Sequence, residues 1–168
     1  INDNKIYSSV SGGIEYSYKG RKIKFVGGRG RIYRYGDNKL VEVYKSLTAD
    51  NSVSKIHFAQ MGNKMVCCNG EDVNVYYEND TFYGLNKWTL IDNFVPMKPF
   101  VFKNRVWYIN AKNKSEAMHS ALQDATTIEG YIDFSGVLPQ ADELIDIKGF
   151  LDFICFIFKN HILVYSGN

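Results

Sequence analysis

One nine-residue pattern occurs four times in the sequence, and it constrains the fold more than any other feature. Each copy opens on a turn-forming pair, has a basic residue in third place and ends on a small residue. The copies are KGRKIKFVG from Lys19, GNKMVCCNG from Gly62, KNRVWYINA from Lys103 and KNHILVYSG from Lys159. They begin 43, 41 and 56 residues apart, and repeats of roughly 40 to 50 residues are typical of β-propeller blades. Such a unit buries its apolar face only against neighbouring units. The pattern is therefore evidence about the fold first and about a functional site only second.

We expect each copy to be the centre of a β-hairpin. The opening pairs contain Gly or Asn, which tolerate the positive φ angles of two-residue hairpin turns. Apolar runs flank these pairs: in the third copy, Phe100–Phe102 precedes the turn and Val106–Ile109 follows it. In the fourth copy, 153–158 precedes the pair Lys159–Asn160 and 162–165 follows it. The turn chemistry and the strand pattern therefore agree at all four places.

A second hairpin follows the first two copies. The runs 31–35 and 40–44 are separated by Gly-Asp-Asn, and the runs 73–77 and 81–83 by Glu-Asn-Asp, with 88–91 continuing outward. Two hairpins make four strands, which is the content of one propeller blade. The sequence thus predicts an all-β, β-propeller-like fold of about three and a half four-stranded blades. The predicted units are about 10–48, 53–92, 97–147 and 150–168, within a single domain or fragment spanning 1–168.

Closed propellers usually have four to eight blades, so three and a half blades close only with further strands. Either residues 1–9 complete the last blade or chain outside this sequence does, and we expect the domain to be part of a larger propeller or a longer protein. The third unit has extra residues after Ala111. There, 114–124 is compatible with a short helical turn, and 119–122 is equally compatible with the third strand of the blade.

The repeating strands also predict the core. Residues at alternate positions of a strand face one neighbour, and inner blades are covered on both faces. The predicted core residues are Val66, Val106, Trp107, Ile109, Ile154, Phe156, Leu163 and Tyr165.

Composition limits the classes of partner. The chain has 168 residues, of which 15% are aromatic and only three are prolines, a composition that favours strands. Its 20 basic and 18 acidic residues leave a net charge of +2. So small a net charge gives the protein no overall electrostatic attraction for anionic partners. We therefore exclude nucleic acid and membranes as primary partners. No apolar stretch reaches the roughly 20 residues that a membrane-spanning helix needs.

Neither the cysteines nor the histidines predict a metal or catalytic site. Cys67 and Cys68 are adjacent and point to opposite faces of a strand, and Cys155 stands alone, so we interpret all three as reduced thiols. His57, His119 and His161 fall at different places in their units, and their spacing matches neither a metal site nor a Ser-His-Asp triad. We therefore expect no cofactor. The GGRGR run at 27–31 is read as a tight turn between strands, because no helix follows it to hold a phosphate.

Carboxylates are the remaining candidates for catalysis. Asp133, Asp142, Glu143 and Asp146 lie close together in the sequence, and propeller glycosidases use paired carboxylates. Carboxylates in and beside turns more often cap backbone amides or face solvent. We expect the chain not to be an enzyme, and we keep a propeller that binds or cleaves host-surface glycans as the alternative.

The basic residue after each turn is a candidate functional position. In a ring, equivalent positions of successive blades lie at equal height, so Arg21, Lys64, Arg105 and His161 would form a basic rim. Such a rim would suit a passage for DNA. The competing interpretation is that exposed turn ends carry charge and discourage edge-to-edge pairing.

Several stretches of residues 54–168 resemble a known family of proteins. The similarity lies in FAQMGNKMVCCNGEDVNVYY, in PFVFKNRVWYIN, in the run from Ser120 to Asp133 and in LPQADELIDIKGFLDFICFIFKNHILVYSGN. These stretches are similar to the tail nozzle, or stabilisation (tail tubular-type), proteins of short-tailed phages. The resemblance implies a β-propeller-bearing protein that forms a ring, commonly of six subunits, at the distal end of the tail around the DNA passage. Proteins of this family have no catalytic residues, so the resemblance implies none for this chain.

The resemblance sets the functional expectation. It implies a structural component of the virion tail, made in the host cytoplasm, that assembles by protein–protein contacts with other tail proteins and as a homo-oligomeric ring in the full-length protein. Contact with DNA would be transient and limited to its passage along the axis.

Overall fold

The computed structural model describes residues 12–47, 49, 54–85, 94–138 and 142–166, and in this part of the chain the regular elements are all β-strands. They form four antiparallel sheets in which neighbouring strands follow chain order. The predicted all-β, propeller-like architecture is therefore confirmed.

Among the described residues, three sheets have four strands and the last has three. The first sheet contains β1 (Gly12–Tyr18), β2 (Arg21–Gly28), β3 (Arg31–Gly36) and β4 (Lys39–Lys45). The second contains β5 (His57–Met61), β6 (Lys64–Cys68), β7 (Asn74–Glu78) and β8 (Thr81–Gly84). The third contains β9 (Pro96–Phe102), β10 (Arg105–Asn110), β11 (Glu116–Ala121) and β12 (Asp124–Asp133). The fourth contains β13 (Leu144–Phe150), β14 (Phe153–Phe158) and β15 (Ile162–Ser166).

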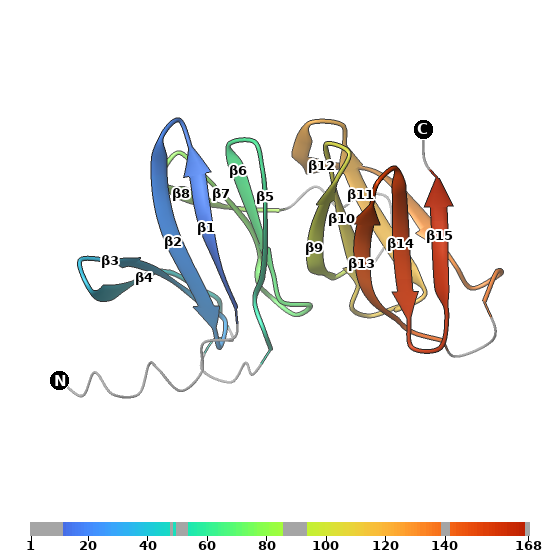
Figure 1. Ribbon diagram of the computed structural model, residues 1–168. Helices are drawn as coiled ribbons and strands as arrows, with labels where there is room; N and C mark the ends of the chain where they lie inside the picture. The colour runs from blue at the N-terminus through green and yellow to red at the C-terminus, as the bar shows by residue number, and fades with distance from the viewer. Residues whose placement is uncertain (1–11, 48, 50–53, 86–93, 139–141, 167–168) are drawn as a thin grey trace.

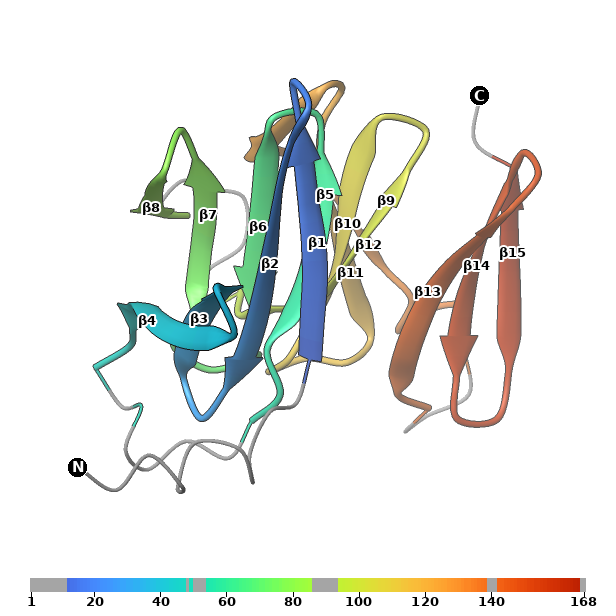
Figure 2. The same cartoon turned by 60° about the vertical axis from the view of Figure 1, so that its left-hand side comes forward.

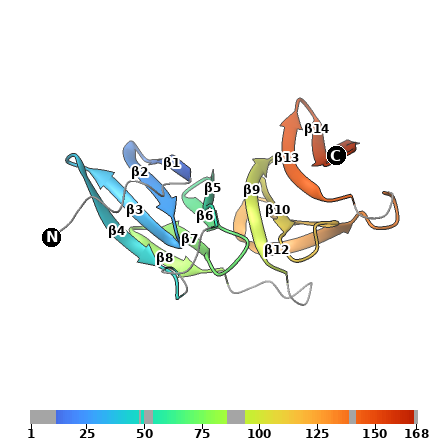
Figure 3. The same ribbon diagram turned by 90° about the horizontal axis from the view of Figure 1, so that it is seen from below.

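The sheets stand face to face in a row, in chain order, with the first and fourth at opposite ends (Figure 1). Figure 2 also shows the fourth sheet at one end of the row. Seen from below, each sheet is turned relative to the one before it, as blades are around an axis (Figure 3). The first strand of each sheet contacts the first strand of the next, so β1, β5, β9 and β13 form the inner side of the row. The remaining strands of each sheet extend outward from it.

Three apolar cores lie between successive sheets. The first joins Phe25 and Ile32 to Met65 and Tyr77, and the second joins Val66 and Cys68 of the second sheet to Tyr108 and Met118 of the third. The third core joins the third and fourth sheets, and its buried members are Trp107, Ile109, Ala117, Phe134, Leu144, Ile147, Ile154, Phe156 and Phe158. Each middle sheet is covered on both faces, as the strand patterns predict.

Six of the eight predicted core residues are buried: Val66, Val106, Trp107, Ile109, Ile154 and Phe156. Leu163 is half-buried against the third core, and the prediction is wrong for Tyr165, whose exposed fraction is 53%. Both residues lie in β15, the outermost strand of the last sheet. An outermost strand has less of the neighbouring sheet in front of it, so alternation alone overestimates its burial.

The fourth copy of the pattern is out of place, which is the main correction to the sequence-based prediction. Lys19–Gly20, Gly62–Asn63 and Lys103–Asn104 each join the first and second strands of a sheet. Lys159–Asn160 lies instead in the loop between β14 and β15, the second and third strands. The equivalent turn of the fourth sheet is Leu151–Asp152, between β13 and β14. That turn lies at the same end of the row as the first three, called the upper end below, whereas the β14–β15 loop lies at the other end (Figure 1).

The structure also moves one unit boundary and decides between two open interpretations. The third predicted unit runs to 147 and the fourth begins at 150, but Leu144–Phe150 is the first strand of the fourth sheet. The chain from 114 to 124 is not helical: it contains β11, as the second of the two interpretations predicts. The second hairpins of the first two units are confirmed by β3–β4 and β7–β8. Residues 1–9 and 88–91, for which strands were considered, lie outside the described residues.

Candidate functional site: the inner strands and the upper end

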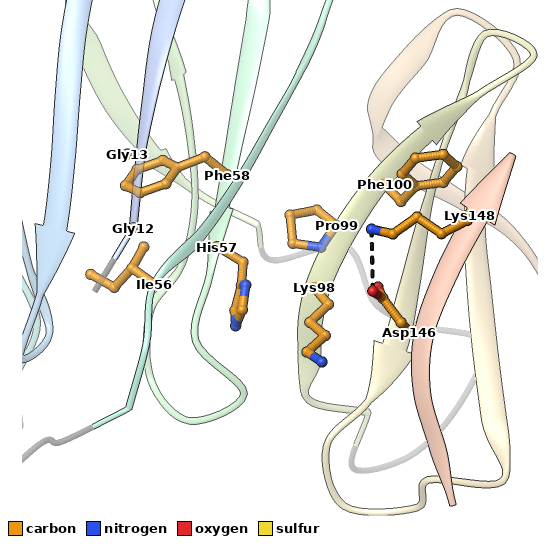
Figure 4. A pocket seen from close by; sticks show the side chains of 10 residues that line it. All are labelled: Gly12, Gly13, Ile56, His57, Phe58, Lys98, Pro99, Phe100, Asp146 and Lys148. Atoms are coloured by element: carbon orange, nitrogen blue, oxygen red, sulfur yellow. Dashed lines mark ion pairs between the residues drawn. The ribbon is translucent and has the colours of Figure 1, made fainter. Parts of the chain in front are cut away.

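A hollow of about 450 Å³ opens along the inner strands of all four sheets. It is lined by Gly12, Gly13, Ile56, His57, Phe58, Lys98, Pro99, Phe100, Asp146 and Lys148. Figure 4 shows His57 on β5, Lys98 on β9, and Lys148 and Asp146 on β13 around this space. In a propeller this is the place of the axial passage, so the hollow is the first candidate for a functional surface.

A bulge in β9 presents the first of the two lysines. Trp107 pairs with Phe100 and Ile109 with Met97, so one extra residue of β9 stands between them. Lys98, in this bulge, has a φ of 49°, and its Nζ donates a hydrogen bond to the carbonyl oxygen of Ile145 across the hollow. The bulge therefore turns Lys98 toward the inner strand of the next sheet.

The second lysine is partly neutralised. Nζ of Lys148 lies 3.2 Å from Oδ2 of Asp146 and 5.6 Å from the centre of the Phe100 ring. Burial, followed by the charges of Lys98 and Lys55, lowers the pKa of His57, and Asp146 only partly opposes this effect. His57 is therefore neutral at neutral pH, and the hollow carries two lysines against one carboxylate.

The predicted basic rim is only partly brought together. Arg21, Lys64 and Arg105 each begin the second strand of their sheet at the upper end. His161 precedes β15 at the opposite end, so it does not belong to this set. In the fourth sheet, Phe153 occupies the equivalent position, because it is the first residue of the second strand, β14. Sequence alone missed this because the fourth copy matches in residue type but sits one hairpin later.

The three basic residues at the upper end are all ion-paired. Nη1 of Arg21 lies 2.5 Å from Oδ2 of Asp80, and Nζ of Lys64 lies 3.4 Å from Oδ1 of Asp124. Arg105 pairs with Glu129 of its own sheet. These pairs connect side chains of neighbouring strands or sheets. Because each cation has a carboxylate partner, the upper end does not present a row of free cations.

The four carboxylates considered for catalysis do not form an acid pair. Asp133 accepts a hydrogen bond from the backbone N–H of Ser135, and Asp146 pairs with Lys148. Glu143 lies between the Nζ atoms of Lys114 and Lys159, at 3.1 and 3.0 Å. The remaining member of the set, Asp142, is described next. Asp133, Asp142 and Asp146 each accept a backbone N–H, as the turn-capping interpretation predicts, whereas Glu143 forms ion pairs.

Asp142 organises the loop before β15. One of its oxygens accepts the N–H of Asn160, and the other lies 2.5 Å from Nδ1 of His161. Burial raises the pKa of Asp142, but the hydrogen bonds from His161 and Asn160 outweigh that effect and leave it below the ordinary value. The carboxylate is thus ionised and structural.

A second hollow, of about 530 Å³, lies between the third and fourth sheets near the upper end. Its lining is aromatic and cationic: Phe102, Lys103, Arg105, Trp107, His119, Leu122, Ile132, Ile154 and Tyr165. The rings of Trp107 and His119 lie 4.8 Å apart. Sequence reasoning did not find this hollow, because its walls come from strands of two sheets and no local pattern joins them.

The thiols and the glycine-rich run behave as expected. Cys67 and Cys68 are buried, and burial raises the pKa of both thiols, whereas Cys155 is half-buried; all three are free. Arg29–Gly30 forms a tight turn between β2 and β3, with both φ angles positive. In the described part of the chain, no group of three or more His, Cys, Asp or Glu could hold a metal ion, and no helix is long and apolar enough to cross a membrane.

Comparison with known proteins adds no relative: no protein-family model matches the chain, and no curated protein matches it at a significant level.

Proposed function

We propose that this chain is a structural component of a bacteriophage tail, in the nozzle or hub ring that lines or closes the DNA exit path. Two lines of support combine. Residues 54–168 resemble tail nozzle proteins in sequence, and the chain folds into propeller-like blades, as that resemblance implies. The protein acts by assembling with other tail proteins and, in its full-length form, as a homo-oligomeric ring. It is made in the host cytoplasm and resides in the virion.

The observation that carries the proposal is the hollow along the inner strands. Lys98 and Lys148 line it, and both are restrained by acceptors of the chain itself, Ile145 and Asp146. Cations of this kind attract the phosphate backbone without base contacts. Because each lysine already has an acceptor within the chain, its attraction for phosphate is weakened. The lysines would therefore guide DNA without binding it tightly. That balance suits a passage through which a genome moves quickly.

The first experiment asks whether the protein is in the particle. Purified phage particles from the source that encodes this sequence are analysed by mass spectrometry, and the tail is located with gold-labelled antibody raised against residues 12–166. Detection at the tail tip supports the proposal. Particles that package DNA but lack the protein would overturn it.

The second experiment tests the DNA path. Particles with Lys98→Glu and Lys148→Glu should assemble but eject their genomes more slowly, because two like charges now face the phosphates. Lys39→Glu, on the exposed outer strand β4, is the matched control and should eject normally. Normal ejection by the double variant would contradict a role for the hollow in DNA passage.

Glycan binding is the second candidate function, and the hollow between the third and fourth sheets is the observation that favours it. Trp107, Tyr165 and His119 offer ring faces, and Arg105 and Lys103 offer donors, as acidic sugars require. A glycan array probed with the purified chain tests this. Binding lost in Trp107→Leu with the fold retained would support it, and an array without signal would dismiss it.

A further inference from the structure

A further hollow, of about 560 Å³, lies between the outer strands of the first and second sheets. Arg34, Val43 and Tyr44 line it on the first sheet, and Thr81 and Phe82 line it on the second. Hollows of this volume are typical of small-molecule sites. Both sheets have all four strands of a blade, so this hollow belongs to the junction of two complete blades.

The hollow does not arise where a described segment of the chain stops. It reaches the upper end, where Arg21 begins β2 and the turn Asn79–Asp80 precedes β8. The described segments begin or stop at the other end of these sheets. Gly12 pairs near the end of β2, Lys45 pairs with the start of β3, and the N–H of Leu85 donates to the start of β7. Continuous hairpins therefore form both walls of the hollow.

A bulge in β4 turns two consecutive side chains into the hollow. The register of β3 and β4 shifts after Ile32, which leaves Val43 as an extra residue of β4. Consecutive residues of a regular strand point to opposite faces, yet Val43 and Tyr44 both line the hollow. The ring of Tyr44 lies 5.6 Å from the ring of Phe82 on the second sheet. One part of the lining is therefore apolar and aromatic.

The polar part of the lining is fixed by Asp80. One oxygen of Asp80 lies 2.5 Å from Nη1 of Arg21, and the other accepts a hydrogen bond of 2.7 Å from the hydroxyl of Tyr77. The hydrogen bonds from Arg21 and Tyr77, together with the charges of Arg21 and Arg34, hold the pKa of Asp80 below its ordinary value. Asp80 is therefore ionised, and both of its oxygens already have partners.

Arg34 supplies the charge that is left over. The described residues give its guanidinium group no hydrogen bond and no ion pair within 4 Å, and its side chain is exposed at the hollow. Because Asp80 balances Arg21, the lining carries one uncompensated positive charge. A guanidinium group binds a carboxylate through two parallel hydrogen bonds. A carboxylate carries one negative charge and a phosphate monoester about 1.5 to 2, so the single excess charge favours a carboxylate.

We propose that this hollow binds a sugar acid, that is, a pyranose ring that carries a carboxylate. The carboxylate binds to Arg34, the C–H face of the ring packs against Phe82 and Tyr44, and a ring hydroxyl bonds to the hydroxyl of Thr81. A neutral sugar lacks the charge and an inorganic anion lacks the ring, so neither satisfies both parts of the lining. The site lies between other sheets than the hollow considered above for glycans, and it does not depend on a role in a tail.

An NMR titration of the intact, isotope-labelled chain with sodium glucuronate tests the proposal. We expect saturable shifts at the amides of Arg34, Val43, Thr81 and Phe82. Glucose and inorganic phosphate, at the same concentrations, should give no saturable shifts at these amides. Phosphate binding as tight as that of glucuronate would reveal a general anion site and overturn the proposal.

Two substitutions separate the contacts. Arg34→Gln should weaken glucuronate binding about tenfold, because a charge-assisted pair of hydrogen bonds is lost. Thr81→Val keeps the shape of the side chain and should weaken binding about two- to fivefold through its lost hydroxyl. Arg29→Gln is the matched control: it removes the same charge from the exposed turn between β2 and β3, at the other end of the sheet, and should leave binding unchanged. Unchanged binding in Arg34→Gln would refute the assignment.

The remaining probes identify the ligand and its source. Benzoate binding more tightly than glucuronate would assign the hollow to aromatic acids and overturn the sugar. Shifts confined to His119 and Tyr165 would place binding in the hollow between the third and fourth sheets and would also overturn it. Methyl glucuronoside has its first oxygen blocked, as in a polysaccharide. Its binding would support a terminal sugar of a polymer as the ligand, and binding of glucuronate alone would support the free acid.

Discussion

A side chain on Gly27 would collide with Ile56: a Cβ atom built on Gly27 lies 2.8 Å from the Cβ of Ile56 and 2.9 Å from the ring of Phe58. Gly27 closes the first copy of the repeated pattern, and Ile56 and Phe58 begin the second sheet. The last position of the second copy shows the same relationship, because a Cβ on Gly70 would lie 3.0 Å from the Cβ of Ala111. The small residue that ends each of these copies is therefore a point of close approach to the next sheet.

Replacing Gly27 by Ala should destabilise the fold by about 1–3 kcal/mol, because the added methyl group forces two sheets apart. Chemical denaturation followed by tryptophan fluorescence measures the loss. Gly36→Ala is the control, since nothing lies within 4 Å of a Cβ at that position. Equal stability of the two variants would contradict the close approach.

Truncation of Phe156 should be among the most costly changes. Its exposed fraction is 1%, and its ring lies 4.8 Å from Phe134 and 5.6 Å from Trp107. Phe156→Ala should lower the free energy of unfolding by about 3–5 kcal/mol. Phe153→Ala is the matched control on the other face of β14, where 41% of the side chain is exposed, and it should cost clearly less. Unfolding in urea measures both.

The stability of the fold should fall with acid partly through Asp124. Burial raises its pKa, but hydrogen bonds from Thr126 and Thr127 and the charge of Lys64 hold that pKa well below the ordinary value. A lowered pKa in the folded state stabilises the protein above the unfolded-state pKa near 4, and this contribution disappears as the pH falls further.

We therefore expect Asp124→Asn to reduce the loss of unfolding free energy between pH 7 and pH 3 by about 1–2 kcal/mol, after allowance for solvent screening. Urea titrations at both pH values measure this. Asp37→Asn, in an exposed turn where the described residues give the carboxylate no hydrogen bond or ion pair, should leave the pH dependence as it is. A parallel shift of both curves would argue against Asp124 as a source of acid lability.

The three thiols should differ in reactivity. Burial raises the pKa of Cys67 and Cys68, so neither forms the reactive thiolate in the folded protein. With Ellman's reagent we expect one equivalent of thiol, Cys155, to react in native buffer and three in denaturant. Rapid reaction of all three under native conditions would show that the second sheet opens.

No hydrolysis of oligosaccharides is expected. The carboxylates of Asp133, Asp142, Glu143 and Asp146 are bound to separate backbone and side-chain partners, and inverting or retaining hydrolysis needs two that face one substrate. A panel of labelled glycans incubated with the purified chain tests this. Turnover that Asp133→Asn abolishes, without loss of the fold, would refute the expectation.

The sequence by itself determined the strands, their hairpins and the all-β class. Turn pairs such as Lys103–Asn104 adopt positive φ angles at both positions, and runs of apolar residues form the adjoining strands. These are local properties, carried by a few neighbouring residues, so a single sequence is enough to predict them. The first three copies of the pattern were placed correctly for this reason.

Only the tertiary structure decided the place of the fourth copy and the composition of the sites. Lys159–Asn160 has turn-like chemistry, yet Leu144–Phe150 occupies the inner position of its sheet because Leu144 and Ile147 bury their side chains against the third sheet. That shift moved His161 away from the upper end. The pairs Arg21–Asp80 and Lys64–Asp124 join residues 59 and 60 positions apart, and each hollow joins residues from more than one sheet. Such contacts depend on how whole sheets pack, and no short-range pattern in the chain encodes them.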